Sequence, residues 1–187
     1  MFFCKVLVLA EGIEDVAYIT AYLSLSGLMS QFRRHGCHIV PVGGKSEIMK
    51  PLAMAKQLQI PVYVVLDADT GTTKADDIIK HKNDNAAILS LLGHASENMW
   101  PSTSIWRNDL TMWNTNITQV VEAELGENWK QHCDAAAAHY GNAGGLKKNP
   151  LAVSRALETA WVNNTRSSSL QQLAKNIISF AESSRGN

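Results

Sequence analysis

Short apolar runs alternate with amphipathic segments in the first part of the chain. The runs are residues 5–10, 37–42 and 61–66. Residues 5–10 are rich in β-branched residues and end at Glu11-Gly12, which is typical of a strand buried on both faces of a sheet, and the other two runs are predicted as the second and third strands. Helical spacing of apolar positions predicts helices over residues 14–25 and, with Ser46 as the cap, over residues 46–59. This alternation favours an α/β fold with a mainly parallel sheet and helices on both faces.

The second half of the chain is expected to be mostly helical. Residues 72–113 have no clear period, and the polar stretch 74–85 is expected to be a solvated helix or loop. Four later helices are predicted, over residues 117–125, 131–140, 149–162 and 170–180. We therefore expect a single domain, with a core over residues 1–100 and a helical C-terminal extension over residues 101–187.

Composition adds little about function. The 187 residues include 17 Lys and Arg against 17 Asp and Glu, so the net charge is +0 and a nucleic-acid partner would need a local site. The three cysteines lie far apart without a Cys-x-x-Cys pair, which argues against a disulfide framework and fits a reducing, cytoplasmic location. No apolar run is long enough for a signal peptide or a membrane span, so no membrane partner is expected.

Four carboxylates follow the first and third predicted strands. Glu11 ends the first strand and Asp15 lies about one helical turn later, whereas Asp67 and Asp69 follow the third strand. The segment from Asp67 to Asp69 is expected to be extended, so that both side chains share a face. Since functional groups gather at the carboxyl ends of parallel strands, we expect the four acids to converge. Hard oxygen ligands suit Mg²⁺ or Mn²⁺ better than zinc, and a cation would offset their repulsion.

A single acid in such a position is more commonly a turn residue or a helix-starting charge, but the set of four favours a metal site. The same residues resemble the TOPRIM domain that topoisomerases, bacterial primases and nucleases of the overcoming-lysogenization-defect (OLD) family share. The resemblance rests on a hydrophobic strand followed by Glu at residues 6–11 and a strand followed by Asp-x-Asp at residues 62–69. The Gly-Gly-Lys turn at residues 43–45 and the Ile-Pro-Val at residues 60–62 are most similar to the OLD nucleases.

The match is close over residues 5–72 and continues more weakly at residues 121–125 and 146–150. One departure is Asp15, which stands where OLD nucleases usually have Glu. The other is the large ATPase domain with which OLD nucleases normally begin, which this sequence lacks. The resemblance therefore implies an isolated nuclease domain or a fragment, with an ATPase domain or subunit as its partner.

The resemblance implies a metal-dependent DNA endonuclease or nickase that cleaves phosphodiester bonds with two Mg²⁺ or Mn²⁺ ions. Glu11 would be a metal ligand or base, and Lys148 or Lys147 would stabilise the charge of the transition state. The further metal ligands that it implies are Asp15, Asp67, Asp69 and Glu122. The substrate that it implies is DNA.

Two other function classes remain open. Residues 64–70 also fit the Asp-x-Asp-x-Thr start of haloacid-dehalogenase-like phosphatases, in which Asp67 would be the nucleophile. That motif usually follows the first strand of such enzymes, whereas here a complete strand and Glu11 come before it. The other alternative is a TOPRIM-like module that binds DNA without catalysis.

Several remaining residues have both a structural and a functional interpretation. Lys45, Arg33 and Arg34 could contact DNA phosphates, although single basic residues are more commonly solvated surface. Residues 43–46 imitate the end of a P-loop, but Ile39 stands where that motif requires its first glycine, so a tight turn is expected. The five tryptophans are expected in the core and not stacked on bases.

Overall fold

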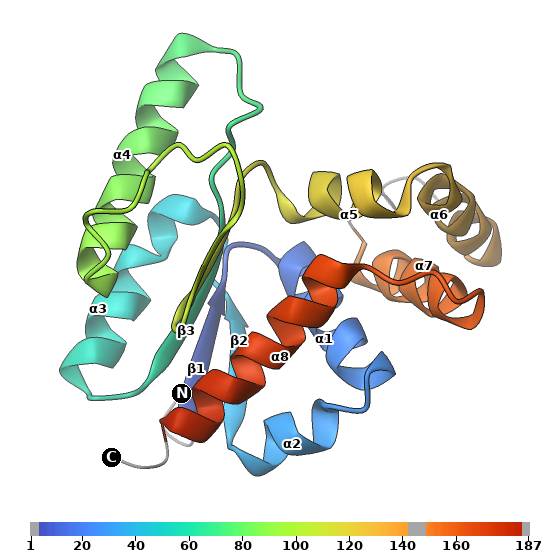
Figure 1. The fold of residues 1–187 in the computed structure, drawn as a ribbon, viewed down its shortest axis with the longest axis horizontal. Helices are drawn as coiled ribbons and strands as arrows, with labels where there is room; N and C mark the ends of the chain where they lie inside the picture. Colours follow the sequence, from blue (N-terminus) through green and yellow to red (C-terminus); the bar gives the residue numbers. More distant parts are fainter. Residues whose placement is uncertain (1–3, 142–148, 185–187) are drawn as a thin grey trace.

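A five-stranded sheet with helices on both faces forms the centre of the molecule (Figure 1). The computed structural model describes residues 4–141 and 149–184. The strands are β1 (Val6–Ala10), β2 (Cys37–Pro41), β3 (Val62–Asp67), β4 (Ile105–Arg107) and β5 (Leu110–Trp113). They lie in the order β2-β1-β3-β5-β4, and all neighbours are parallel except the β4–β5 hairpin. The predicted α/β fold with a mainly parallel sheet is confirmed.

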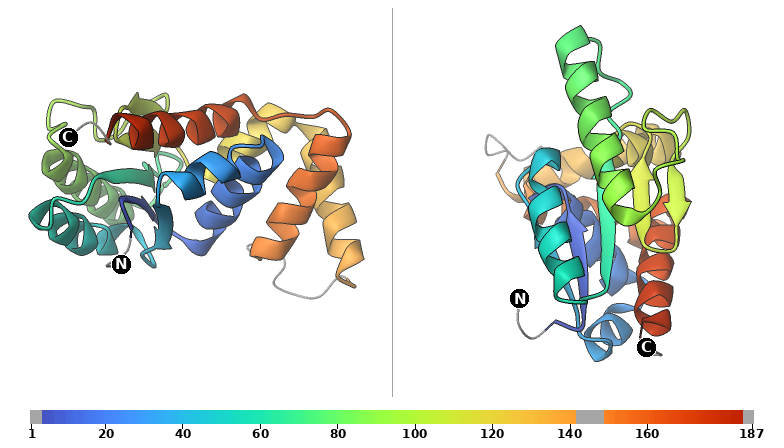
Figure 2. Two further views of the ribbon diagram at one scale, coloured as in Figure 1. Left: turned by 90° about the horizontal axis from the view of Figure 1, so that it is seen from below. Right: turned by 90° about the vertical axis from the view of Figure 1, so that its left-hand side faces the viewer.

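The helices divide between the two faces of the sheet. They are α1 (Ile13–Leu25), α2 (Met29–Arg34), the 3₁₀ turn η1 (Lys45–Glu47), α3 (Met49–Gln57), α4 (Ala75–Leu92), α5 (Ile117–Leu125), α6 (Glu127–His139), α7 (Pro150–Val162) and α8 (Ser168–Ser183). One face is covered by α3 and α4, and the other by α1, α8 and their neighbours (Figure 2). Within the described ranges, no helix combines the length and the apolar character needed to cross a bilayer.

The core explains why the first strand reads as one unbroken apolar run. Val6 and Val8 point into the cluster beneath α1 and α8, whereas Leu7 and Leu9 point into the cluster beneath α3 and α4. All of these side chains are almost completely buried. A strand covered on both sides must be apolar at every position, since alternate residues face opposite layers.

The C-terminal helices build a layer against α1. Helix α7 contacts both α1 and α6, and α8 contacts α1 and lies along the sheet (Figure 1). Trp129 of α6 is buried in this layer, and Trp113 of β5 is buried beneath it. The expectation that tryptophans belong to the core holds for these two, while Trp106 and Trp161 pack against the core with partial exposure.

The sequence pattern was least informative over residues 72–113. The polar stretch begins a long helix, α4, and the segment after it forms β4 and β5, which the sequence did not predict. These strands have only 3 and 4 residues, too few to establish a period of two. The sheet therefore extends beyond residue 100 into the segment that was expected to be mostly helical.

The predicted start of the helix after residue 46 was also wrong. Helix α3 begins at Met49, and its first turn is preceded by the 3₁₀ turn η1. Ser46 does not cap it, because the Ser46 hydroxyl instead donates a hydrogen bond to the Asp84 carboxylate of α4 at 2.7 Å. That bond ties η1 to α4 across the end of the sheet.

Candidate functional site

Glu11 and Asp67 lie side by side where the adjacent parallel strands β1 and β3 end. The backbone N–H of Asp67 donates a hydrogen bond to Glu11 Oε2 at 3.3 Å. Asp67 Oδ1 in turn accepts the backbone N–H of Ile117, the first residue of α5, at 3.3 Å. The predicted convergence of these two acids follows from the parallel pairing of their strands. The positive end of the α5 dipole faces the same place.

Asp15 adds a third carboxylate from the first turn of α1. Its Oδ2 accepts the backbone N–H of Gly12 at 2.7 Å, which caps the start of the helix. Its Oδ1 is buried and has no hydrogen-bond partner in the described part of the chain. A buried carboxylate oxygen without a donor is unfavourable. It is the kind of atom that a bound cation would satisfy.

These acids oppose one another's ionisation. Burial raises the pKa of Asp15 to about 7, and the charges of Glu11 and Glu14 add to that effect. Burial raises the pKa of Asp67 well above its ordinary range, helped by the charges of Asp15 and Glu11. Burial also raises the pKa of Glu11. Buried carboxylates that repel one another in this way are characteristic of functional sites that bind cations.

Asp69 faces a buried lysine. The ammonium of Lys45 donates a hydrogen bond to Asp69 Oδ2 at 2.7 Å, and the lysine side chain is only 3% exposed. His81 of α4 completes the cluster, with Nδ1 3.2 Å from Asp69 Oδ2 and 3.3 Å from Lys45 Nζ. The interpretation of Lys45 as solvated surface is therefore wrong. We call Glu11, Asp15, Asp67 and Asp69 the acidic site.

The Gly-Gly turn explains how Lys45 comes to be inside. The backbone N–H groups of Gly43 and Gly44 both donate to the Glu11 carbonyl oxygen, at 3.1 and 2.9 Å. The φ angles of Gly43 and Gly44 are 87° and 134°, which side-chain-bearing residues rarely adopt. The turn is thus folded around the end of β1, and the next residue, Lys45, enters the acidic site. The expectation of a tight turn without a P-loop agrees with this geometry.

The segment from Asp67 to Asp69 is not extended, contrary to the prediction. Strand β3 ends at Asp67, and Asp69 has a φ of 59°, in the left-handed region that Asp tolerates better than most residues. The backbone N–H groups of Ala68 and Asp69 donate to the carbonyl oxygens of Trp113 and Thr115, at 2.7 and 2.9 Å. This bend after the strand turns Asp69 toward Lys45.

The remaining predicted residues lie elsewhere. Glu122 is exposed on α5, where its charge adds to the effect of burial in raising the pKa of Tyr18 and of Cys133. Lys147 and Lys148 lie outside the described residues. Across residues 4–141 and 149–184, no three Asp, Glu, His or Cys side chains are arranged as ligands of one ion.

Two basic residues proposed for phosphate contact are remote from the acidic site. Arg33 and Arg34 end α2, which leads into the amino end of β2. They are therefore at the opposite edge of the sheet. His81, by contrast, belongs to the site and was missed, because a lone histidine on a polar helix carries no spacing signal. The Gly-Gly-Lys motif was a usable signal for Lys45.

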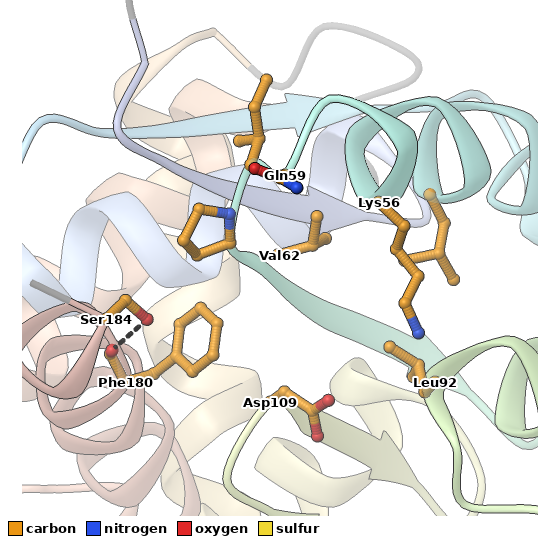
Figure 3. Close-up of a pocket in the computed structure, with 10 residues that line it drawn as sticks. Lys56, Gln59, Val62, Leu92, Asp109, Phe180 and Ser184 are labelled. Carbon is orange, nitrogen blue, oxygen red and sulfur yellow. Dashed lines mark hydrogen bonds between the residues drawn. The ribbon is translucent and has the colours of Figure 1, made fainter. Parts of the chain in front are cut away.

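A surface hollow of about 430 Å³ also lies away from the acids (Figure 3). It is lined by Lys56 of α3, by Gln59 after that helix, by Leu92 at the end of α4, and by Asp109 and Phe180. These residues surround the amino end of β3, whereas the acidic site lies at its carboxyl end. The hollow is therefore separate from the chemistry of the site.

Comparison with known proteins shows which family the first part of the chain resembles. Residues 2–69 match the family model of the TOPRIM domain of overcoming lysogenization defect protein-like proteins. That segment contains Glu11, Asp15, Lys45, Asp67 and Asp69. A search of curated proteins gave no match.

Solved structures similar to the whole chain are C-terminal regions of OLD proteins. The region from Burkholderia pseudomallei OLD has a TM-score of 0.55 at 16% identity, covering 99% of this chain and 98% of the other. The region from Xanthomonas campestris pv. campestris OLD has a TM-score of 0.53 at 12% identity, covering 100% of this chain and 96% of the other. Residues 2–69 thus match the model of an OLD-like TOPRIM domain, and the chain as a whole has the fold of OLD C-terminal regions.

Proposed function

We propose that this chain is a Mg²⁺- or Mn²⁺-dependent nuclease domain that cuts or nicks DNA. The observation that carries the proposal is the convergence of Glu11, Asp15 and Asp67, with the buried Asp15 Oδ1 left unpaired. An all-oxygen donor set fits a hard divalent cation. The OLD-like TOPRIM match supports a nuclease-type domain.

In this proposal the acidic site holds the metal. Glu11, Asp15 and Asp67 would ligate a divalent cation, which supplies a water nucleophile and neutralises charge on the scissile phosphate. Side-chain rotations would bring their oxygens to the ~2.1 Å that Mg²⁺ requires. The start of α5, which already donates to Asp67, adds a positive field toward an approaching phosphate.

The other predicted residues keep their proposed roles from the family resemblance. Asp69 and Glu122 would serve a second metal ion, and Lys148 or Lys147 would face the charge of the transition state. The solved neighbours are C-terminal regions of OLD proteins. We therefore propose that the nuclease works with an ATPase domain or subunit, with residues 1–100 as the TOPRIM core and residues 101–187 as the extension that completes the site.

The test is nicking of supercoiled plasmid DNA with Mg²⁺ or Mn²⁺. We expect activity that EDTA abolishes and that Glu11→Gln and Asp67→Asn each reduce by about 10²-fold or more, because each removes a charged ligand. Glu158→Gln is the matched control, since Glu158 is an exposed acid of α7 that pairs with Arg155 at 3.4 Å on the same helix.

The outcomes separate the three function classes. Cleavage that survives excess chelator would contradict the metal-dependent mechanism. Hydrolysis of a small phosphomonoester without DNA cleavage would identify the phosphatase alternative, with Asp67 as nucleophile. DNA binding without cleavage under any metal would leave the non-catalytic module.

A further inference from the structure

Lys45 is an unusual residue to find beneath a metal site. Its side chain is 3% exposed and its ammonium donates a hydrogen bond to Asp69 at 2.7 Å, so Lys45 is enclosed in the same cluster as the acids. Lysine is rarely buried unless its charge is paired. Here the pairing partner is itself a predicted metal ligand, so a lysine and a metal ion would compete for Asp69.

The lysine charge reaches beyond Asp69. It lowers the pKa of Glu11 and of Asp67, against the stronger opposing effect of burial on both. Asp15, in contrast, is 5% exposed with one oxygen unpaired among the described residues, and burial and the charges of Glu11 and Glu14 raise its pKa. The Lys45 ammonium therefore balances the negative charge of the acidic site near Asp69, whereas no such cation lies against the described part of the site near Asp15.

The fold holds the ammonium in place. Lys45 follows the Gly43–Gly44 turn, whose N–H groups are bonded to the Glu11 carbonyl oxygen. Ile48, three residues later, is fully buried. His81 of α4 borders the ammonium at 3.3 Å. Anchored on both sides, this short segment cannot swing out as an exposed lysine would.

We propose that the Lys45 ammonium is a built-in cation that occupies the Asp69 side of the acidic site in place of a second divalent ion. This inference rests on the proposed function. One divalent ion binds firmly through Glu11, Asp15 and Asp67, and a second reaches Asp69 only by displacing Lys45. Lys45 is thus a positioning residue that sets how many metal ions the domain holds before DNA arrives.

Calorimetric titration of the full chain with Mn²⁺ tests this. Wild type should bind one ion firmly. Lys45→Met removes the charge, so Mn²⁺ should bind about tenfold more tightly or with an additional firm site, because a like charge within a few ångströms has been removed. Lys56→Met is the control, since Lys56 lies on α3 at the far end of the sheet; it should bind Mn²⁺ as wild type does.

A second variant guards against misfolding. Lys45→Gln also removes the charge but keeps an N–H donor for Asp69, so it should fold and tighten Mn²⁺ binding as Lys45→Met does. Melting in EDTA gives an independent readout: both neutral variants should melt below wild type without metal and gain more than wild type from added Mn²⁺.

The difference between variants and wild type decides the inference. Unchanged or weaker Mn²⁺ binding in folded Lys45→Gln overturns it. Mn²⁺ binding by wild type tests the proposed function separately. If wild type binds no Mn²⁺ while Lys45→Gln binds one ion, the proposal that Lys45 is the built-in cation stands. The proposal of a metal-dependent nuclease is then wrong. If neither protein binds Mn²⁺, both proposals fail.

Discussion

Asp15 shows how one side chain can serve both the fold and the chemistry. Its Oδ2 caps α1 through the Gly12 N–H, while its Oδ1, in the acidic site, has no partner among the residues that the structure describes. The sequence offered these as alternatives, a helix-starting charge or a metal ligand. The two oxygens of one carboxylate allow both, since a cap needs only one acceptor.

Without metal, the stability of the protein should fall as pH rises toward neutrality. Folding raises the pKa of Asp15 from the ordinary 3.8 to about 7, so between these values the folded protein binds a proton that the unfolded chain does not. The resulting stabilisation is fully present below about pH 4 and is lost as pH rises through about pH 7. Burial of Asp67 acts in the same direction.

Melting temperatures measured in EDTA from about pH 5 to about pH 8 check this. Wild type should lose several degrees over that range, and Asp15→Asn should show a flatter profile because the titrating group is gone. Equal slopes for the two proteins would mean that Asp15 is not the group responsible.

A second prediction at the residue scale concerns the lysine pair beyond α6. Lys148→Ala should leave Mn²⁺ affinity nearly intact while lowering the cleavage rate by about 10²-fold, the usual effect of deleting a charge that faces the transition state. Excess metal should not rescue it. Cleavage rates across a Mn²⁺ series, with affinity from calorimetry, give the answer. If Lys147→Ala is slow and Lys148→Ala is normal, the other lysine acts; if neither matters, the C-terminal part of the family resemblance is misassigned.

At the scale of elements, α5 links the acidic site to the C-terminal layer. Its first residue, Ile117, donates to Asp67, and near its other end Glu124 binds the start of α8. The Glu124 carboxylate accepts hydrogen bonds from the side chains of Ser168 and Ser169 and from the Ser169 backbone N–H, the last at 3.1 Å. Ser167, the cap of α8, donates to the same carboxylate.

Replacing Glu124 by Ala should therefore loosen α8 and cost about 1–2 kcal/mol of folding free energy, the scale of a lost helix cap. Urea denaturation of Glu124→Ala, with Glu158→Gln as control, measures this. Burial opposes ionisation of Glu124, but the serine hydrogen bonds outweigh it and lower its pKa. The stabilisation that the Glu124 carboxylate provides is thus present above its ordinary pKa of 4.5 and is lost as pH falls below that value. The folding free energies of the variant and wild type should therefore converge in acid. A constant difference down to low pH would argue that packing, not the carboxylate, is responsible.

At the scale of the whole molecule, metal binding should be coupled to folding. The acidic site joins β1, α1 and β3, and it borders α5, so its ligands assemble only in the folded chain. A ligand that binds only the folded state stabilises it, by about 2.7 kcal/mol at a concentration 100 times its Kd. Mn²⁺ should raise the melting temperature at pH 7.5, and EDTA should reverse the gain. The melting temperature of Asp67→Asn should change little on addition of Mn²⁺. A full rise in the melting temperature of that variant would place the metal elsewhere.

Local sequence was sufficient for much of the sheet and for the carboxyl-end acids. Strands β1 and β3 are buried on both faces, so their apolar runs are unbroken, and parallel pairing places Glu11 beside Asp67 wherever those strands are neighbours. Helices α1, α5, α7 and α8 have apolar positions at helical spacing and agree with prediction to within a few residues at their ends. The Glu and Asp-x-Asp motifs indicated the TOPRIM resemblance for the same reason, since the spacing of these acids from the strands is local.

Only tertiary structure decided the rest. Strands β4 and β5 are too short to show a period, and they are strands because β3 offers an edge for β5 to pair with. The left-handed turn at Asp69 accompanies a hydrogen bond from its backbone N–H to the carbonyl oxygen of Thr115, far along the chain. Whether Lys45 is a surface charge or a buried one depends on α4, whose His81 closes over it. Pairing between distant segments leaves no pattern in either segment alone, so the sequence determined which acids gather and the fold determined which of them a lysine already holds.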